Sequence, residues 1–174
     1  MIHKLLTFDI ADRRNRQIFQ AIIQGLIDLC DFIGDTSQMV MAEIGSDRGE
    51  SAELFAQYFK MVYCIDPLID PIEQEPSFRS RTIRFSNIQL IRLWSEQASQ
   101  NFDNNCLDFI YIDADHSYEA VKKDIECWLP KLRGNYIGGH DFHGGNLGVV
   151  RAVIERFGEP RIFQDNSWIK KVKE

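Results

Sequence analysis

Acidic side chains and histidines follow two apolar runs of the sequence. The residues concerned are Asp113, Asp115 and His116 after the first run, and His140 and Asp141 after the second. If both runs are strands of a parallel sheet, their carboxyl ends lie at one edge, where the sites of α/β folds form. Carboxylates and imidazoles there can hold a divalent cation or take a proton from a hydroxyl group. Because three strand-end carboxylates would otherwise repel one another, we interpret the acids as a site.

A second candidate site is the turn after the apolar run at residues 40–44. Gly45 and Gly49 can adopt positive φ and let a ligand approach the backbone. A helix with apolar residues at helical spacing follows, and its first N–H groups are free to bind a ligand. Glu43 ends the apolar run, where a carboxylate is costly unless it has a partner. Strand, turn and helix in this order predict a nucleotide-binding βαβ unit.

The acidic residues of the turn argue against a dinucleotide. A dinucleotide site has the pattern Gly-x-Gly-x-x-Gly and cradles a pyrophosphate, whereas Asp47 stands here in place of the second glycine. Glu43 and Asp47 would both repel phosphate, which disfavours an NAD-dependent oxidoreductase. The pattern Glu-x-Gly-x-x-x-Gly resembles motif I of class I S-adenosylmethionine-dependent methyltransferases, whose ligand carries a sulfonium and an amino acid tail. A tight turn without a ligand remains the alternative at this point.

Two further strand ends carry residues suited to a nucleoside. Asp66 follows the apolar run at residues 61–65, about 20 residues beyond the glycine turn, where a Rossmann-like fold binds ribose hydroxyls. The alternative for Asp66 is a turn residue before proline. Trp94 and Ser95 follow the run at residues 88–93, where an adenine could stack and form hydrogen bonds. The alternative for Trp94 is a tryptophan buried in the core.

The sequence predicts an α/β fold, a Rossmann-like three-layer sandwich with a mostly parallel twisted sheet. A helix is expected at residues 15–33, and strands and helices alternate five times in the core at residues 39–172. Two short strands around Asp165 and Asn166 are expected to close the sheet as an antiparallel hairpin. We expect one domain, residues 1–174.

Two segments of this prediction are less regular. Residues 1–14 are expected to form a mobile arm. We expect Gly134 to end the helix that follows the fourth strand, and residues 136–139 to form the fifth strand.

The stretches 112–118 and 136–142 carry a closer resemblance. The chain resembles small-molecule O-methyltransferases of the macrocin O-methyltransferase type, distant relatives of catechol O-methyltransferase, from about Met39 to Lys171. The resemblance implies S-adenosylmethionine as cofactor and a divalent cation such as Mg²⁺, with the following residues. Glu43, Gly45 and Ser46 hold the methionine portion, Asp66 the ribose, and Ser95 with Glu96 or Trp94 the adenine; Asp113, His140 and Asp141 bind the cation, and Asp115 is the general base.

The sequence departs from that family at one position. Several of its members have two oxygen ligands at the end of the fifth strand, whereas this chain has His140 beside Asp141. Magnesium prefers oxygen ligands, so the identity of the metal, and its presence, stay open.

Methyl transfer is an in-line displacement, which requires the acceptor oxygen, the methyl carbon and the sulfur to be aligned. Either Asp115 or His116 could accept the proton of the acceptor hydroxyl. One alternative is a metal-dependent hydrolase that uses His116, His140, Asp141 and His143, although it leaves the Glu43 turn and Asp66 unexplained. The other is a methyltransferase fold that binds cofactor or a partner chain without turnover.

Composition and net charge limit the classes of molecule that the protein is expected to bind. The 174 residues are 44% hydrophobic, which suits one domain with a sizeable core. A net charge of −6 and a pI near 5.2 argue against nucleic acid or an anionic membrane as the main partner. The sequence has no signal peptide pattern and no membrane-length apolar run. Its four scattered cysteines indicate reduced thiols in a cytoplasmic protein. We expect a small-molecule acceptor, and the first helix could pair with a second subunit.

Overall fold

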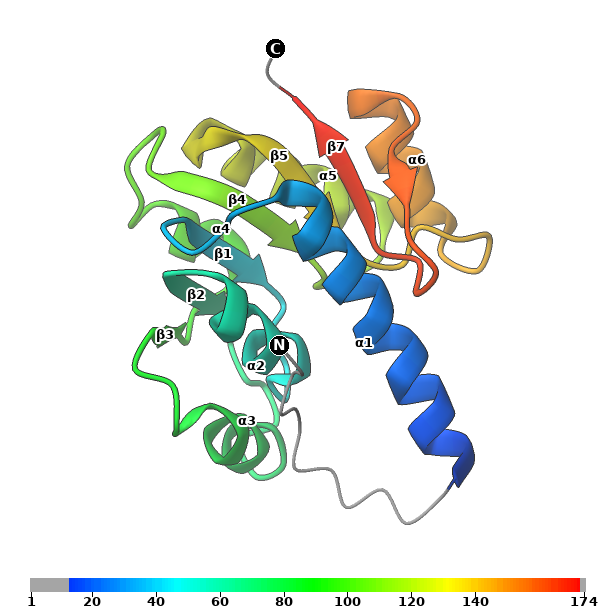
Figure 1. The fold of residues 1–174 in the computed structure, drawn as a ribbon. Coiled ribbons are helices and arrows are strands. Elements are labelled where there is room, and N and C mark those ends of the chain that lie inside the picture. Colours follow the sequence, from blue (N-terminus) through cyan, green and yellow to red (C-terminus); the bar gives the residue numbers. More distant parts are fainter. Residues whose placement is uncertain (1–12, 173–174) are drawn as a thin grey trace.

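A single seven-stranded sheet organises the protein. The structure, a computed structural model, describes residues 13–172, with side chains from residue 23 onward. The strand order is β3-β2-β1-β4-β5-β7-β6 (Figure 1). The strands are β1 (Val40–Ile44), β2 (Met61–Ile65), β3 (Ile88–Ile91), β4 (Leu107–Ile112), β5 (Leu132–Gly139), β6 (Arg161–Ile162) and β7 (Trp168–Lys171). The helices are α1 (Arg13–Ile33), α2 (Glu50–Tyr58), α3 (Gln74–Thr82), α4 (Ser95–Ser99), α5 (Tyr118–Trp128) and α6 (Leu147–Phe157), with a 3-10 turn at Leu129–Lys131.

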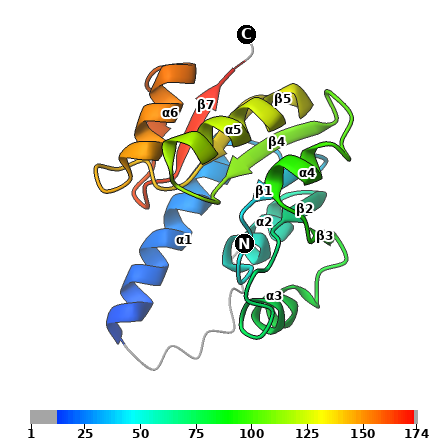
Figure 2. The same ribbon diagram turned by 180° about the vertical axis from the view of Figure 1, so that it is seen from behind.

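The predicted three-layer sandwich is confirmed. Strands β1 to β5 are parallel, and the chain closes with β7 antiparallel to β5 and to β6. Helices α1 and α2 cover one face of the sheet and α4, α5 and α6 the other (Figures 1 and 2). Because the order reverses between β1 and β4, the carboxyl ends of these two strands flank the switch point at which α/β folds bind ligands.

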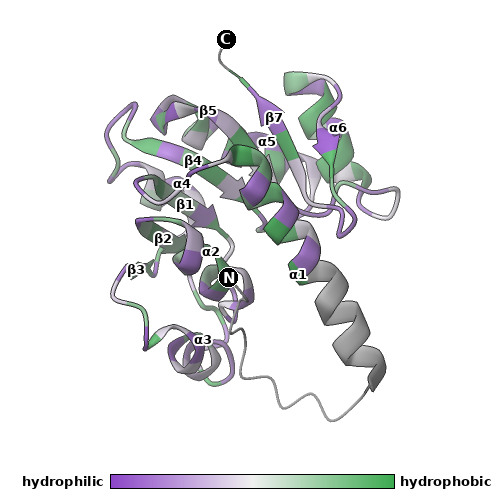
Figure 3. Ribbon diagram, in the orientation of Figure 1, coloured by the Kyte–Doolittle hydropathy of each residue, from purple (hydrophilic) through white to green (hydrophobic). Residues whose placement is uncertain are grey.

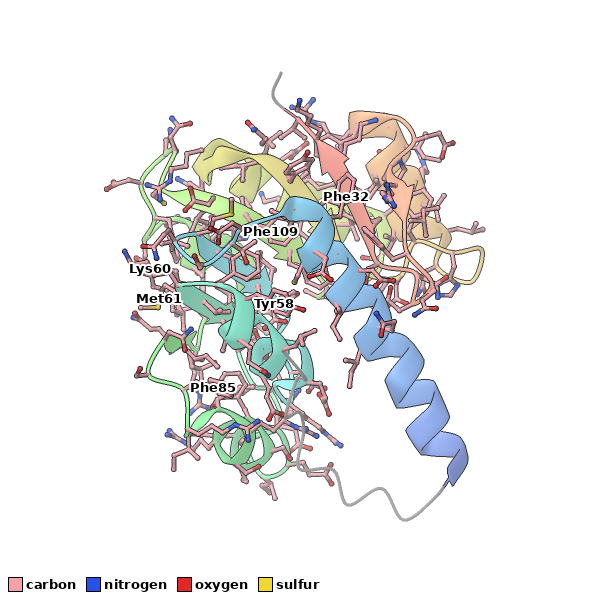
Figure 4. The ribbon with its side chains drawn as sticks, in the orientation of Figure 1. Phe32, Tyr58, Lys60, Met61, Phe85 and Phe109 are labelled. Atoms are coloured by element: carbon pink, nitrogen blue, oxygen red, sulfur yellow. The ribbon has the colours of Figure 1, made fainter. Side chains whose placement is uncertain are left out.

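Side chains alternate between the two faces along the central strands. Phe109 and Tyr111 of β4 pack under α2, with the Phe109 ring stacked on Phe59 at a centroid distance of 5.8 Å. Figure 4 labels Phe109 on this face of the sheet. Ile110 and Ile112 belong to the other cluster, under α5 and α6. By the same alternation, the strand-end residues in register with Tyr111 point toward α1 and α2.

Helix α1 packs on the sheet through its C-terminal half. Leu26, Leu29 and Cys30 are buried, and hydrophobic and hydrophilic residues alternate along this half in Figure 3. Gly25 approaches the turn between β6 and β7 so closely that a Cβ atom there would lie 2.0 Å from the Asp165 carboxyl carbon. Residues 1–12 of the predicted mobile arm lie outside the described residues. Within the described residues, no helix is long and apolar enough to cross a membrane.

The prediction around Gly134 is wrong. Helix α5 ends at Trp128, a 3-10 turn follows, and β5 begins at Leu132, so Gly134 lies within the strand. A Cβ atom at Gly134 would lie 1.8 Å from the Asp108 carbonyl oxygen, beside the register shift between β4 and β5. The glycine therefore permits a close approach of two strands and does not end a helix. The third strand is also shorter than predicted and ends at Ile91.

Candidate functional site

Three strand ends are tied together at the glycine turn. Gly45 donates a backbone hydrogen bond to Ile65 at the end of β2, and Asp113 donates one to Ile44, both at 2.8 Å. Gly45 has φ +89°, and a Cβ atom there would lie 2.2 Å from the Asp113 carbonyl oxygen. Only glycine fits this position, because both the positive φ and the close approach exclude a side chain. Gly49 also has positive φ, 81°, but it lies at the start of α2 against Phe78.

Glu43 is a fully buried carboxyl group beneath this turn. The Ser51 hydroxyl donates a hydrogen bond to Oε1, whereas Oε2 has no hydrogen-bond partner among the described residues. Burial raises the pKa of Glu43 to about 7, against the opposing effect of Ser51. The Ser46 hydroxyl is likewise buried, and although it lies close enough to Glu43 to lower that group's pKa, it has no partner at hydrogen-bond geometry within the described part of the chain. Such atoms are costly in isolation, so their presence beneath a glycine turn indicates a polar ligand.

The first cavity, here called the turn cavity, lies between the glycine turn and α1. It measures about 270 Å³, and its lining includes Ile23, Leu26, Ser46, Leu54, Asp113 and His140. Helix α1 and Leu54 of α2 provide the apolar wall, and the strand ends provide polar groups.

The second cavity, here called the strand-end cleft, lies on the other side of the turn. It measures about 470 Å³, and its lining includes Gly45, Asp66, Trp94, Ser95, Asp113 and Asp115. Gly45, Asp47 and Asp113 line both cavities, so one elongated ligand can extend from one into the other.

Asp66 is buried at the mouth of the cleft. Its carboxylate accepts hydrogen bonds from the backbone N–H groups of Asp47, at 2.9 Å, and Leu68, at 2.7 Å. Each carboxylate oxygen can accept a second hydrogen bond, so these contacts orient Asp66 without exhausting it. Trp94 is 60% exposed, which contradicts the alternative of a buried core tryptophan.

The catalytic candidates gather around His116. Its Nε2 atom lies 3.4 Å from Asp113 Oδ1 and 3.0 Å from Asp141 Oδ2. These two carboxylates raise the pKa of His116, mostly through the hydrogen bond that His116 donates to Asp113, against the opposing effect of burial. Burial raises the pKa of Asp113, while His116 and His140 lower it. Asp141 has φ +61°, the left-handed region that an aspartate tolerates only at a cost, and this turn presents its carboxylate to His116.

The structure brings together a different set of potential metal ligands from the predicted one. Within the described residues, ligand atoms of Asp113, His116 and Asp141 all lie within 4.8 Å of one another. His140 is not part of this group. Its Nδ1 atom lies 3.6 Å from Asp141, and its buried Nε2 atom faces Asp165 at 3.8 Å without a hydrogen bond. The sequence could not distinguish His116 from His140, because the choice depends on how each loop leaves its strand.

Asp115 is placed differently from the predicted general base. Its carboxylate accepts a hydrogen bond from the Ser117 backbone N–H at 2.8 Å, which lowers the pKa of Asp115. It lines the strand-end cleft, and a carboxylate with a lowered pKa is a weak base. Its geometry is that of a turn residue before α5, whose N-cap is Ser117.

Sequence reasoning missed two groups that line the cavities. Ile23 and Leu26 carry only the signal of an amphipathic helix, which indicates that the helix covers either a sheet face or the ligand site without distinguishing the two. Asp124 lines the strand-end cleft, and its signal was a polar residue on the inward face of α5, next to Val121, Ile125 and Trp128 in the apolar stripe.

Comparisons with known proteins identify the family of the chain. A family model described as a methyltransferase domain matches residues 42–142, more than half of the chain. An uncharacterized protein of Acanthamoeba polyphaga mimivirus is 30% identical over 120 residues, which are 62% of this chain and 53% of that protein. The chain thus aligns with about half the length of this relative.

Solved structures of similar fold cover nearly the whole chain. The cofactor-bound structure of Rv0187 from MTB has a TM-score of 0.68 at 16% identity, covering 98% of this chain and 93% of that one. A SAM dependent methyltransferase from Aquifex aeolicus has a TM-score of 0.63 at 13% identity, covering 91% of each chain. Identities this low establish the fold alone.

The fold defines a class, the proteins with the Rossmann-like fold of S-adenosylmethionine-dependent methyltransferases. Within that class, the chain belongs to the methyltransferase domain family whose model spans β1 to the loop after β5.

Proposed function

We propose that the protein transfers a methyl group from S-adenosylmethionine to a hydroxyl group of a small molecule. The observation that carries the proposal is the pair of buried, unpaired polar atoms, Glu43 Oε2 and Ser46 Oγ, beside the turn where the two cavities meet. Glu43 and Ser46 suit an ammonium group at one end of the ligand, and Asp66 suits sugar hydroxyls at the other. Family membership favours methyl transfer over the metal-dependent hydrolase.

The residues present fit each part of this cofactor. Glu43 and Ser46, below Gly45, would hold the amino acid end, and Asp66 would accept from the ribose hydroxyls. The exposed face of Trp94 and the polar Ser95 would hold the adenine in the strand-end cleft. When bound, S-adenosylmethionine supplies a methyl group activated by its sulfonium.

The acceptor then belongs to the turn cavity. Ile23, Leu26 and Leu54 provide an apolar wall for its body, and His116 lies at the strand ends with Asp113, which lines both cavities. His116 can accept the hydroxyl proton, because Asp113 and Asp141 stabilise the imidazolium that forms. Oriented carboxylates of this kind raise the basicity of a histidine without a large motion.

The same three side chains also fit a divalent cation. Two carboxylates and one imidazole suit a first-row metal such as Mn²⁺ at least as well as Mg²⁺, which prefers oxygen. When bound by Asp113, His116 and Asp141, a cation would lower the pKa of an acceptor hydroxyl. The test of this assignment is binding of Mn²⁺ by calorimetry. Asp141→Asn and His116→Ala should each weaken Mn²⁺ binding at least tenfold, whereas His140→Gln should leave it within about threefold of the wild type. Equal losses in all three variants would contradict the assignment.

The first experiment on the cofactor is calorimetry and thermal unfolding with S-adenosylhomocysteine, the demethylated product. At a hundredfold excess over Kd the ligand should add about 2.7 kcal/mol to the free energy of unfolding, a rise of roughly 5–10 °C in Tm. Asp66→Ala should abolish the shift, whereas Asp103→Ala, an exposed residue remote from both cavities, should retain it. No binding of the adenosyl ligand, with a shift from Mg²⁺ alone, would favour the hydrolase instead.

We further propose a cytoplasmic protein that acts on a small molecule, with α1 as a surface for a second subunit. Analytical ultracentrifugation of the purified protein measures directly whether it pairs with a second subunit.

A further inference from the structure

A buried chain of hydrogen bonds ends in the strand-end cleft. The indole Nε1–H of Trp128, a fully buried residue, donates to the Ser95 hydroxyl oxygen at 2.9 Å, and that hydroxyl donates to Asp124 Oδ1. Asp124 is 6% exposed, and it lines the cleft together with Ser95. The methyl-transfer chemistry proposed above makes no use of this carboxylate.

The direction of this chain is fixed by its first member. An indole N–H can only donate, so the Ser95 oxygen accepts, and the one proton of Ser95 must go to Asp124. Asp124 therefore acts as an acceptor toward Ser95. Its second oxygen, Oδ2, has no hydrogen-bond partner among the described residues and is the atom available to a ligand.

The surroundings keep Asp124 a carboxylate at mildly alkaline pH. Burial raises the pKa of Asp124 to about 6, with the Ser95 hydrogen bond opposing. Lys123, a basic residue in the cleft lining, is 51% exposed and paired with Glu96 at 3.0 Å. Asp124 thus offers an acceptor to the cleft, and a ligand group that reaches it must donate.

The position of Asp66 in the same cleft decides which part of a nucleoside can reach Asp124. Asp66 lies beside the glycine turn, whereas Ser95 and Asp124 come from α4 and α5, with apolar Ile65 and Ala114 also in the lining. With the ribose at Asp66, the base would lie against the apolar residues of the same lining, with its edge toward Asp124.

We infer that Asp124 selects the base of the bound nucleoside by accepting a hydrogen bond from an exocyclic amino group, such as the 6-amino group of adenine. A purine with a carbonyl at this position presents an acceptor to a carboxylate and is rejected. The inference rests on the proposed function, since it names the residue that reads the base in the same cleft. Sites built to pair a buried polar group discriminate strongly, because the wrong ligand leaves that group unpaired.

The test compares S-adenosylhomocysteine with S-inosylhomocysteine, which differ only in the amino or carbonyl group at purine position 6. Calorimetry at pH 8 should show that the wild type binds the adenosyl ligand about 10- to 100-fold more tightly. In Asp124→Asn the Ser95 proton still requires an acceptor, so the amide oxygen turns toward Ser95 and the NH₂ group toward the ligand. This variant should bind the adenosyl ligand at least tenfold more weakly, and the ratio of the two dissociation constants should fall to near one or reverse. Glu126→Gln, which removes the same charge two residues further along α5 and outside the cleft, should keep the wild-type ratio.

The outcomes separate this inference from the proposed function. Equal binding of the two ligands by the wild type would overturn the role of Asp124 while leaving S-adenosylmethionine as the cofactor. This comparison uses the wild-type protein alone, so it does not depend on the folding of a variant. An unchanged ratio in a folded Asp124→Asn protein would overturn it as well. Failure of the wild type to bind either ligand would overturn the proposed function and this inference together.

Discussion

At the scale of single residues, the buried Glu43 carboxyl links pH to stability. Its folded pKa of about 7 exceeds the ordinary value of 4.5, because burial disfavours the charge. The stabilisation from a raised carboxyl pKa is complete below pH 4.5 and is lost as the pH rises toward 7. Ionising Glu43 then costs the folded protein on the order of 3 kcal/mol.

Replacing this carboxyl group should therefore remove a pH dependence. We expect the unliganded Glu43→Gln protein to gain stability relative to the wild type between pH 5 and pH 8, by up to about 3 kcal/mol. Urea unfolding at both pH values measures the change. Glu126→Gln, an exposed carboxyl on α5, should follow the wild type. Parallel pH profiles for Glu43→Gln and the wild type would show that the group is not ionising in this range.

At the scale of elements, α1 is held to the rest of the fold by a close contact. Gly25 meets Asp165, which is buried and accepts hydrogen bonds from the Ser167 backbone N–H at 2.9 Å and its hydroxyl at 2.7 Å. Asp165 therefore has little room to move aside for a methyl group. We expect Gly25→Ala to destabilise the protein by about 1–3 kcal/mol through overpacking, a loss of roughly 2–10 °C in Tm. Gln24→Ala, at the exposed neighbouring position, should stay within about 0.5 kcal/mol of the wild type, and an equal Tm for Gly25→Ala would mean that α1 does not pack there.

Elements with a strong local sequence pattern could be predicted from the sequence. Features that depend on contacts between segments distant in the sequence could not. The five apolar runs and the Glu43 turn predicted the parallel sheet, because buried strands and glycine turns have local signatures. Gly134 was misassigned, because its reason is the approach of the Asp108 carbonyl from another strand. The group of potential metal ligands, Asp113, His116 and Asp141, could be predicted only in part for the same reason. Strand ends identified Asp113 and Asp141, but the side on which His116 and His140 lie depends on loop geometry.

At the scale of the whole molecule, the turn cavity joins parts of the chain that are far apart in sequence. Ile23 and Leu26 come from the first helix, Ser46 from the first turn, and His140 from the end of β5. These residues line one cavity because α1 packs on the sheet beside the glycine turn.

A bound ligand would act there as a removable cross-link. A molecule that touches both Ile23 and His140 bridges a loop of more than a hundred residues without a covalent bond, and it restricts α1 in the folded state. Limited proteolysis and hydrogen exchange test this with S-adenosylhomocysteine, whose amino acid end we place at Ser46 in the turn cavity. At saturation it should slow cleavage and exchange in α1 at least tenfold, more than in α6, which lies on the opposite face. Equal protection of both helices would indicate only global stabilisation. Equal protection would mean that α1 is held in place with or without a ligand. Stronger protection of α1 would mean that α1 moves when the cavity is empty and that ligands enter and leave past it.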